Sequence, residues 1–257
     1  MKRMIVIASG KGGVGKTTTA INLGAAIRQF DKDVLIIDAN MSTPNVGIYL
    51  NSPEVPINLN HVLQRKAHPY EAVYSHESGI KIIPSSLSVK ELKKLKMERL
   101  KDFKKDFSNL AEFVILDCSA GLGKEALSAM EIADEIILVS NPEMPAVTDA
   151  LKTIKVADSL KKPVTGVIMT RVKKNSYELP PGTVKDMLEV PVLGMIPEDP
   201  LFQDALRRKN PLVYLHPKSK PARAYKEIAA RLIDENYDSD IDKPTFWEKV
   251  KGIFGGK

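Results

Sequence analysis

The feature that most constrains this chain is a glycine-rich loop near its N-terminus. Residues 10–18, Gly-Lys-Gly-Gly-Val-Gly-Lys-Thr-Thr, satisfy the P-loop pattern G-x-x-x-x-G-K-[ST]. The apolar run 4–8 before it predicts a buried strand, and the apolar repeat over 17–30 predicts a helix. A glycine loop placed there gathers backbone N–H groups and the positive end of the helix dipole around one anion. The sequence therefore predicts a phosphate site between a first strand and a first helix.

Two residues of this loop have specific predicted tasks. Lys16 is expected to reach the β- and γ-phosphates of a nucleotide, which makes it a candidate catalytic residue, and the Thr17 hydroxyl is expected to bind Mg²⁺. The predicted nucleotide-binding residues of the loop are Gly10, Lys11, Gly12, Gly13, Val14, Gly15, Lys16, Thr17 and Thr18.

Predicted strands and helices alternate along the rest of the chain. Strands are expected at 33–38, 79–84, 112–117, 135–140, 163–171 and 190–196. Helices are expected at 89–110, 145–160, 180–189 and 217–235, with shorter ones at 58–64 and 69–74. This alternation predicts an α/β fold with a doubly wound, mostly parallel sheet flanked by helices. The 257 residues suffice for one such domain with a sizeable core.

The composition and the apolar runs argue against a disulfide-stabilised, a membrane-spanning or a secreted protein. A single cysteine, Cys118, cannot form an intrachain disulfide and fits a reducing compartment. We expect it to be a small buried residue rather than a nucleophile. No apolar run approaches the roughly 20 residues of a membrane span, and no secretory signal is expected. The net charge of +6 favours anionic partners without distinguishing lipid from nucleic acid.

Two predicted strands end in a carboxylate, Asp38 and Asp117. In open α/β sheets the ligand lies outside the carboxyl ends of the strands, so both side chains are expected near the phosphates. Asp117 occupies the position from which a carboxylate holds an Mg²⁺ water beside Thr17, and Asp38 is a candidate ligand through water. The predicted metal-binding residues are Thr17, Asp38 and Asp117.

Lys11 makes the P-loop sequence more specific, because the general pattern allows any residue at this position. Residues 11–18 form the deviant Walker A sequence, and the chain resembles the MinD/ParA family of ATPases, most closely its MinD branch, over residues 1–235. The resemblance implies ATP and Mg²⁺ as cofactors and an ATP-dependent homodimer. It also implies that Lys11 reaches across a two-fold interface to the nucleotide of the second copy, which would give it a catalytic role. Without the resemblance, Lys11 would be a solvated loop lysine.

The resemblance also identifies two loops that respond to the γ-phosphate. Residues 39–45 resemble switch I, and residues 118–123 resemble switch II, where the Gly121 N–H would contact the γ-phosphate. Many relatives carry an aspartate where this chain has Asn40, and that carboxylate is thought to orient or activate the attacking water. An amide cannot take a proton but can orient water. We therefore expect a slow ATPase with Asn40 as a catalytic residue.

Two further segments resemble the parts of the family that border the adenine base. They are the strand end at 170–171 and the Ile-Pro-Glu-Asp sequence at 196–199. The resemblance implies base contacts from Arg171, Pro197 and Glu198.

The predicted helix 89–110 has a basic outer face. It carries eight Lys/Arg residues and four Asp/Glu residues, with the apolar residues on the opposite face. The face could bind DNA or anionic lipid, or be the solvated side of a helix packed on the sheet. The pattern favours the solvated helix.

The end of the chain has a different character from the domain at 1–235. Residues 236–243 are a polar, acidic linker, and residues 244–257 form a tail whose bulky side chains fall within a helical arc of roughly 120°. These predicted membrane-contacting residues are Phe246, Trp247, Val250, Ile253 and Phe254. The pattern is typical of an interfacial helix on an anionic membrane and resembles the membrane-targeting tail of the MinD branch. The alternative is a terminal helix docked on its own domain.

The combined prediction is a MinD-like ATPase in the cytoplasm, peripheral to the inner face of the cell membrane, that positions a cell-division or other polar assembly. Pairing two tails on one dimer raises avidity by about 10²–10⁴, so ATP would switch membrane association on. A regulatory or cargo protein of unknown identity is also expected. The alternatives are a ParA-type DNA-partitioning ATPase and a slow or inactive nucleotide-binding scaffold. An iron–sulfur carrier is disfavoured because one cysteine cannot supply a paired cluster site.

Overall fold

The computed structural model describes residues 2–52, 54–88, 97–238 and 242. Within them, eight strands form one sheet in the order β3-β4-β2-β5-β1-β6-β7-β8, in which β3 and β4 are antiparallel and the other pairs parallel. The strands are β1 (Arg3–Ala8), β2 (Val34–Ala39), β3 (Tyr74–Ser75), β4 (Lys81–Ile83), β5 (Phe113–Cys118), β6 (Glu135–Ser140), β7 (Val164–Val172) and β8 (Val192–Pro197).

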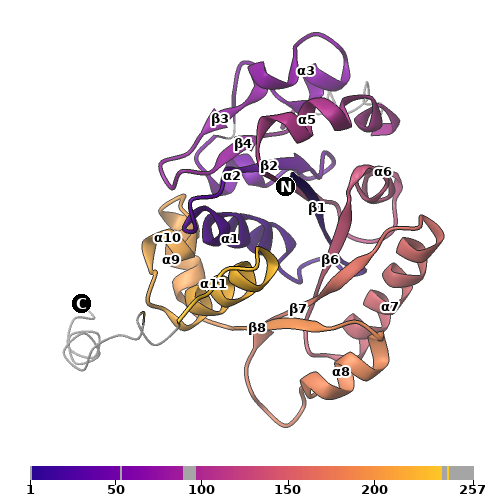
Figure 1. Ribbon diagram of the computed structural model, residues 1–257, viewed down its shortest axis with the longest axis vertical. Helices are drawn as coiled ribbons and strands as arrows, with labels where there is room; N and C mark the ends of the chain where they lie inside the picture. Colours follow the sequence, from indigo (N-terminus) through magenta and orange to yellow (C-terminus); the bar gives the residue numbers. More distant parts are fainter. Residues whose placement is uncertain (1, 53, 89–96, 239–241, 243–257) are drawn as a thin grey trace.

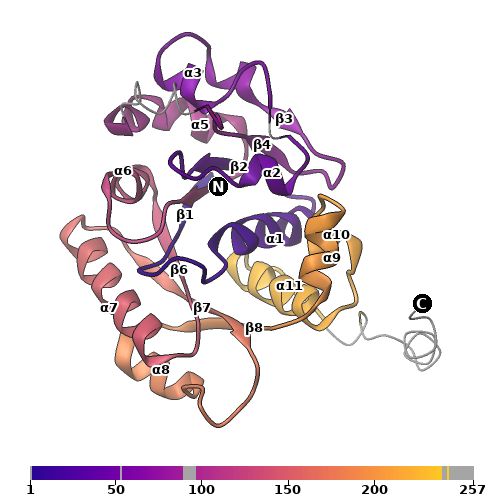
Figure 2. The same cartoon turned by 180° about the vertical axis from the view of Figure 1, so that it is seen from behind.

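Helices cover both faces of this sheet, as Figures 1 and 2 show for α1 and α11 on one side and α6, α7 and α8 on the other. The first face is covered by α1 (Lys16–Arg28), α2 (Val46–Tyr49), α9 (Leu201–Arg207), α10 (Leu212–Leu215) and α11 (Lys220–Leu232). The second is covered by α3 (Leu59–Leu63), η1 (Pro69–Ala72), η2 (Met97–Phe103), α5 (Lys104–Leu110), α6 (Lys124–Ile132), α7 (Met144–Ser159) and α8 (Pro181–Leu188). The predicted doubly wound α/β fold is confirmed.

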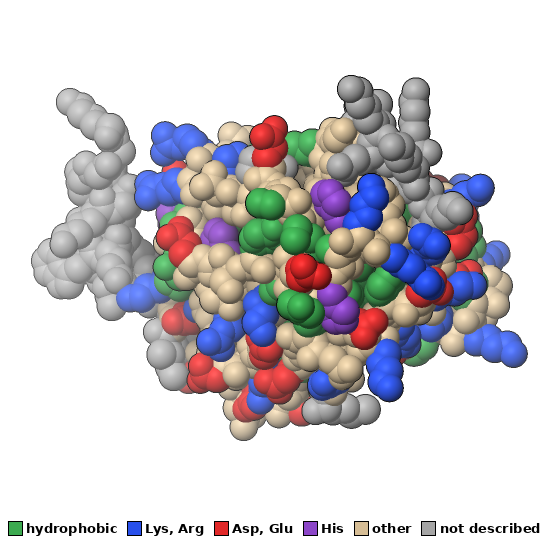
Figure 3. All heavy atoms as spheres, turned by 90° about the horizontal axis from the view of Figure 1, so that it is seen from above, with side chains coloured by type: hydrophobic (Ala, Val, Ile, Leu, Met, Phe, Trp, Pro, Cys, Tyr) green, Lys and Arg blue, Asp and Glu red, His purple; other side chains and the backbone are tan. Residues whose placement is uncertain are grey.

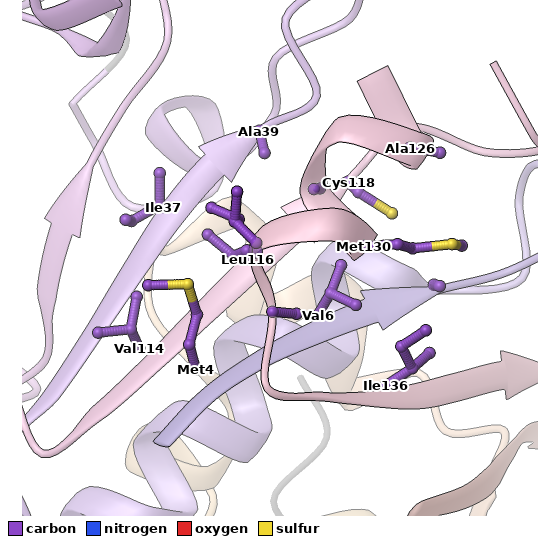
Figure 4. Close-up of a cluster of buried hydrophobic side chains, with 14 of the residues drawn as sticks. Met4, Val6, Ile37, Ala39, Val114, Leu116, Cys118, Ala126, Met130 and Ile136 are labelled. Carbon is purple, nitrogen blue, oxygen red and sulfur yellow. The ribbon is translucent and has the colours of Figure 1, made fainter. Parts of the chain in front are cut away.

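The central strands β1, β2, β5 and β6 are buried on both faces. Along β1, Met4 and Val6 point into one hydrophobic cluster, whereas Ile5 and Ile7 point into the other. Figure 4 shows part of the first cluster, in which side chains of β1, β2 and β5 meet Met130 of α6. Because side chains on both faces of these strands are buried, the strands appear in the sequence as uninterrupted apolar runs.

The predicted helix 89–110 differs from the structure. Residues 89–96 lie outside the described part, and the remainder is the 3₁₀ helix η2 followed by the short α5. Side chains three residues apart eclipse in a 3₁₀ helix, which aligns Met97, Leu100 and Phe103 toward the cluster under η2. Leu100 is fully buried, so this side of η2 packs into the core.

The charged face of this segment is partly engaged by the rest of the domain. Arg99 donates to the Leu63 carbonyl oxygen at 3.1 Å, and the Lys104 ammonium lies 2.7 Å from the Asp134 carboxylate. Figure 3 shows basic and acidic side chains interspersed on the side of the molecule that carries α3 and α5 in Figure 1. This arrangement favours the interpretation of a solvated, packed segment.

The chain after α11 folds back onto that helix. The Asp242 carboxylate accepts hydrogen bonds from the Lys226 ammonium at 2.6 Å and the Tyr237 hydroxyl at 2.7 Å. Lys226 also donates to the Pro217 carbonyl oxygen at 3.0 Å, and the Tyr237 ring packs edge-on against Phe30. The described residues of the predicted linker are therefore held against the domain.

This contact predicts a specific loss of stability. Lys226 is only 5% exposed, so Asp242→Ala would leave a buried ammonium with one neutral acceptor. We expect the free energy of unfolding to fall by roughly 1–3 kcal/mol in chemical denaturation. The matched control is Glu235→Ala, which removes a more exposed ion pair with Lys32 and should change stability by no more than about 0.5 kcal/mol. Equal midpoints for the two variants would contradict this account of Lys226.

Candidate functional site

The candidate site lies at the carboxyl edge of the parallel strands. Asp117 of β5 lies beside Ile7 of β1 on one side and beside Asp38 of β2 on the other. The P-loop follows β1 directly, so residues more than a hundred positions apart in the sequence meet at one edge. This is the edge at which open α/β sheets bind ligands.

Glycines give the P-loop its shape. Gly13 and Gly15 have φ angles of +77° and +93°, in the left-handed region that favours glycine. Gly10 is needed for another reason, because a Cβ atom there would lie 2.3 Å from the backbone oxygen of Asp149 in α7. The loop thus presents its backbone at the N-terminus of α1, as an anion site requires.

The two lysines of the loop differ in their surroundings. Lys16 is 8% exposed, and its ammonium donates to the Ser9 hydroxyl at 2.9 Å, which in turn donates to the Lys11 carbonyl oxygen at 2.8 Å. The Lys11 side chain is exposed. The structure therefore holds Lys16 against its own loop and directs Lys11 to solvent.

Thr17 and Asp117 form the candidate metal site. The Thr17 hydroxyl donates to Asp117 Oδ2 at 2.6 Å, and Asp117 is fully buried. Burial raises the pKa of Asp117 to about 6, although the Thr17 hydrogen bond and the Lys16 charge oppose that rise. Asp117 Oδ1 is buried and has no hydrogen-bond partner among the described residues. An unpaired buried oxygen beside a hydroxyl fits Mg²⁺, which takes oxygen ligands from one or two carboxylates, phosphates and water.

Asp38 shapes the loop that follows β2. Its carboxylate accepts backbone N–H bonds from Asn40 at 3.2 Å, Asn45 at 2.9 Å and Val46 at 3.0 Å. Burial and the nearby Asp117 raise the pKa of Asp38 well above its ordinary value, and the three N–H groups oppose that rise. The sequence predicted a water-mediated metal ligand here and missed this loop-shaping role.

Two groups that we expected to face the γ-phosphate are bonded to the protein in this structure. The Asn40 amide donates to the Thr43 carbonyl oxygen at 2.7 Å and accepts from the Thr43 hydroxyl at 3.1 Å. The Gly121 N–H donates to the Ser9 carbonyl oxygen at 2.9 Å, and its φ is +79°. A contact of the Gly121 N–H with a nucleotide would replace its bond to Ser9, whereas the Asn40 amide keeps a second N–H with which to bind water.

A cavity of about 560 Å³ opens beside the P-loop. The loop and the start of α1 contribute Val14, Gly15 and Thr18 to its wall. The residues predicted to contact the base line the same cavity: Arg171, Pro197 and Glu198. Their side of the cavity is joined to the P-loop by Thr170, whose hydroxyl donates to the Val14 carbonyl oxygen at 2.6 Å.

Sequence reasoning missed other residues of this cavity, including Asn22, Phe202 and Tyr225. Tyr225 is buried, and its hydroxyl lies 3.1 Å from that of Thr19 in α1. It comes from the last described helix, and no local pattern in the sequence connects that helix with the P-loop.

Cys118 is buried, as predicted, and its thiol donates to the Ile7 carbonyl oxygen at 3.2 Å. Burial raises the pKa of this thiol to about 12, which makes it a poor nucleophile. The predicted membrane-contacting residues lie outside the described part of the chain: Phe246, Trp247, Val250, Ile253 and Phe254.

Comparison with known proteins agrees with this geometry. The ParA family model, described as NUBPL iron-transfer P-loop NTPase, matches residues 1–233. The chain belongs to the ParA family. This ParA-family chain is 40% identical to an uncharacterized ATP-binding protein of Methanocaldococcus jannaschii over 98% of the chain and 96% of that relative. It is 29% identical to the septum site-determining protein MinD of Synechocystis sp., over 90% of each chain.

A solved structure is similar to the ParA-family chain as well. Septum site-determining protein MinD from Pyrococcus horikoshii OT3, complexed with Mg-ADP, matches with a TM-score of 0.86 and 33% identity, covering 90% of this chain and 96% of that one. The predicted resemblance to the MinD/ParA family is confirmed.

Proposed function

We propose that this chain is an ATPase that dimerises with ATP, associates with a membrane and positions a cell-division or other polar assembly. The observation that carries the ATPase part is the Thr17–Asp117 pair beside Lys16, with an unpaired Asp117 oxygen at a P-loop. The Mg-ADP bound to the Pyrococcus horikoshii MinD supports ATP and Mg²⁺ as the cofactors.

Each part of the site has a task in this proposal. The P-loop N–H groups and Lys16 bind phosphate oxygens, while Thr17 and Asp117 would hold Mg²⁺ directly or through water. Bound Mg²⁺ would supply neutralisation of the phosphate charge. Asn40 orients the water that attacks the γ-phosphorus, the bond to the ADP oxygen breaks, and the proton of the water passes to an oxygen of the released phosphate. An amide takes no proton, so we expect slow turnover that a partner protein can stimulate.

The exposed surface at the carboxyl edge supports a dimer. Lys11 is exposed there, and Leu122 and Met144 are 36% and 52% exposed. Both apolar residues follow the carboxyl ends of strands, β5 and β6, so they lie at the same edge as Lys11. An exposed cation and exposed apolar side chains at one edge suit a face that meets a second copy and its nucleotide.

The membrane part of the proposal rests on the tail. Residues 1–235 would be the ATPase domain, 236–243 the linker and 244–257 the membrane-targeting tail. Within the part of the chain that the structure describes, no helix has the length and apolar character needed to cross a bilayer. The amphipathic pattern of the tail supports a peripheral association at the cytoplasmic face of the membrane, with a cargo or regulatory protein recruited there.

A sedimentation assay tests the membrane proposal. Full-length protein should sediment with phosphatidylglycerol vesicles at least about tenfold more in ATP than in ADP, because two tails on a dimer bind with higher avidity. Deleting 244–257, or changing Ile253→Asp, should abolish that retention. Glu248→Gln, on the polar side of the same segment, is the matched control and should bind normally.

The same assay with double-stranded DNA separates the alternative. ATP-dependent retention on DNA by the protein without residues 244–257, with no retention on vesicles by the full chain, would favour a ParA-type partitioning ATPase over the membrane proposal.

A further inference from the structure

A contact outside the site joins the loop 39–45 to α6, the helix that follows the loop 118–123. The Ser42 hydroxyl donates to Glu125 Oε1 at 2.5 Å, and the Ser42 N–H lies 3.4 Å from Glu125 Oε2. Ser42 belongs to the loop 39–45, and Glu125 is in the first turn of α6, immediately after the loop 118–123. Eighty-three positions separate the two residues in the sequence.

The Ser42 end of this contact is well positioned. Asp38 fixes the base of the loop through the N–H groups of Asn45 and Val46, and Asn40 closes it through Thr43. Neither set of bonds reaches α6. They define the shape of the loop, whereas the bond from Ser42 to Glu125 defines its placement against the neighbouring element.

The Glu125 end is equally well defined. Ala126, the next residue, is fully buried in the cluster of Figure 4, so the core fixes the position of the first turn of α6. A carboxylate in a first turn is also stabilised by the helix dipole. A hydroxyl that donates to a carboxylate forms a hydrogen bond of the stronger, charge-assisted class.

From these contacts we propose that Glu125 is a positioning residue for the reaction at the nucleotide. By holding Ser42, it keeps the loop that carries Asn40 in register with the loop that carries Gly121. The inference rests on the proposed ATPase function and adds to it a residue outside the P-loop and the metal site.

The chemistry at Asn40 makes such positioning valuable. An amide takes no proton from the attacking water, so Asn40 can act on that water only by orienting it. Misplacing a reacting group by about 1 Å can cost on the order of 100-fold in rate. The contact between the loop 39–45 and α6 should therefore affect the turnover rate without changing the contacts of the P-loop with phosphate.

Steady-state ATP turnover of the full chain tests the proposal, with binding of a fluorescent ADP analogue measured in parallel. Glu125→Ala and Ser42→Ala should each lower kcat by about tenfold, with the dissociation constant for ADP changed by less than about twofold. Ser42→Thr keeps the hydroxyl and should retain at least about half of the turnover. The double variant should be no slower than the slower single variant, since both changes break one contact.

Glu131→Ala is the matched control, because Glu131 lies on the same helix and is exposed. It should leave kcat unchanged. Unchanged kcat in Glu125→Ala, additive losses in the double variant, or an equal loss of ADP binding would overturn the positioning role.

A second measurement keeps the inference separate from the ATPase proposal. If wild-type turnover equals that of Lys16→Ala, the ATPase proposal fails, and the Ser42–Glu125 contact is then tested by amide hydrogen exchange with ATP present. Exchange across 39–46 should be at least about fivefold faster in Glu125→Ala than in Glu131→Ala. Equal exchange in the two variants would show that the contact does not hold the loop.

Discussion

Replacing Lys16 by alanine is expected to abolish ATP turnover and to weaken ADP binding by at least about 100-fold. Lys16 is nearly buried and sits against its own loop, held by the Ser9 hydroxyl. A positive charge in such a shielded position interacts strongly with phosphate oxygens because little water screens it. Phosphate release in the presence of Mg²⁺ and titration with a fluorescent ADP analogue measure the two effects.

Lys11→Ala is the matched control because it lies in the same loop and has an exposed side chain. It should bind ADP as the wild type does, within about threefold, but lose ATP-dependent dimerisation in analytical ultracentrifugation. A loss of ADP affinity as large as that of Lys16→Ala would contradict the separation of the two lysines. Wild-type turnover no faster than that of Lys16→Ala would favour the inactive nucleotide-binding scaffold.

Much of the fold was predictable because burial on both faces leaves a strong local signal. The strand expected at 33–38 is observed as β2 at Val34–Ala39, and the strand expected at 135–140 is β6. Asp38 and Asp117 were expected at one edge because parallel strands end together, and the pairing register places them side by side.

Other features were unpredictable because they depend on contacts between distant segments. The short helices α6, α9 and α10 were not predicted, since runs of four to nine residues show little periodicity. Met97–Phe103 is a 3₁₀ helix packed on a cluster of side chains from distant parts of the sequence, which the pattern of 89–110 does not reveal. Tyr225 in the cavity and Glu125 beside Ser42 leave no trace in their own neighbourhoods of the sequence.

Asp117→Asn is expected to separate the stability of the protein from its activity. Asp117 and Asp38 are both fully buried and lie side by side on neighbouring strands, so each carboxylate loses hydration and repels the other. Without Mg²⁺, the neutral amide should raise the free energy of unfolding by on the order of 1–3 kcal/mol. At roughly 2–4 °C per kcal/mol, the Tm should rise by several degrees. Turnover with Mg²⁺ should fall by at least about 100-fold, because an amide binds Mg²⁺ and its waters weakly.

Asp134→Asn provides the contrasting control in thermal unfolding without Mg²⁺. Partial burial opposes ionisation of Asp134, but the Lys104 ammonium and the Met4 N–H outweigh it and lower its pKa, so this carboxylate stabilises the fold. Its amide variant should therefore unfold at a lower Tm than the wild type, whereas Asp117→Asn unfolds at a higher one. If Asp117→Asn also lowered the Tm, then Lys16 and Thr17 would favour the charged form of Asp117 more strongly than burial opposes it. If Asp117→Asn raises the Tm and Asp134→Asn lowers it, the buried Asp117 carboxylate destabilises the fold, and its proposed benefit to the protein depends on bound Mg²⁺.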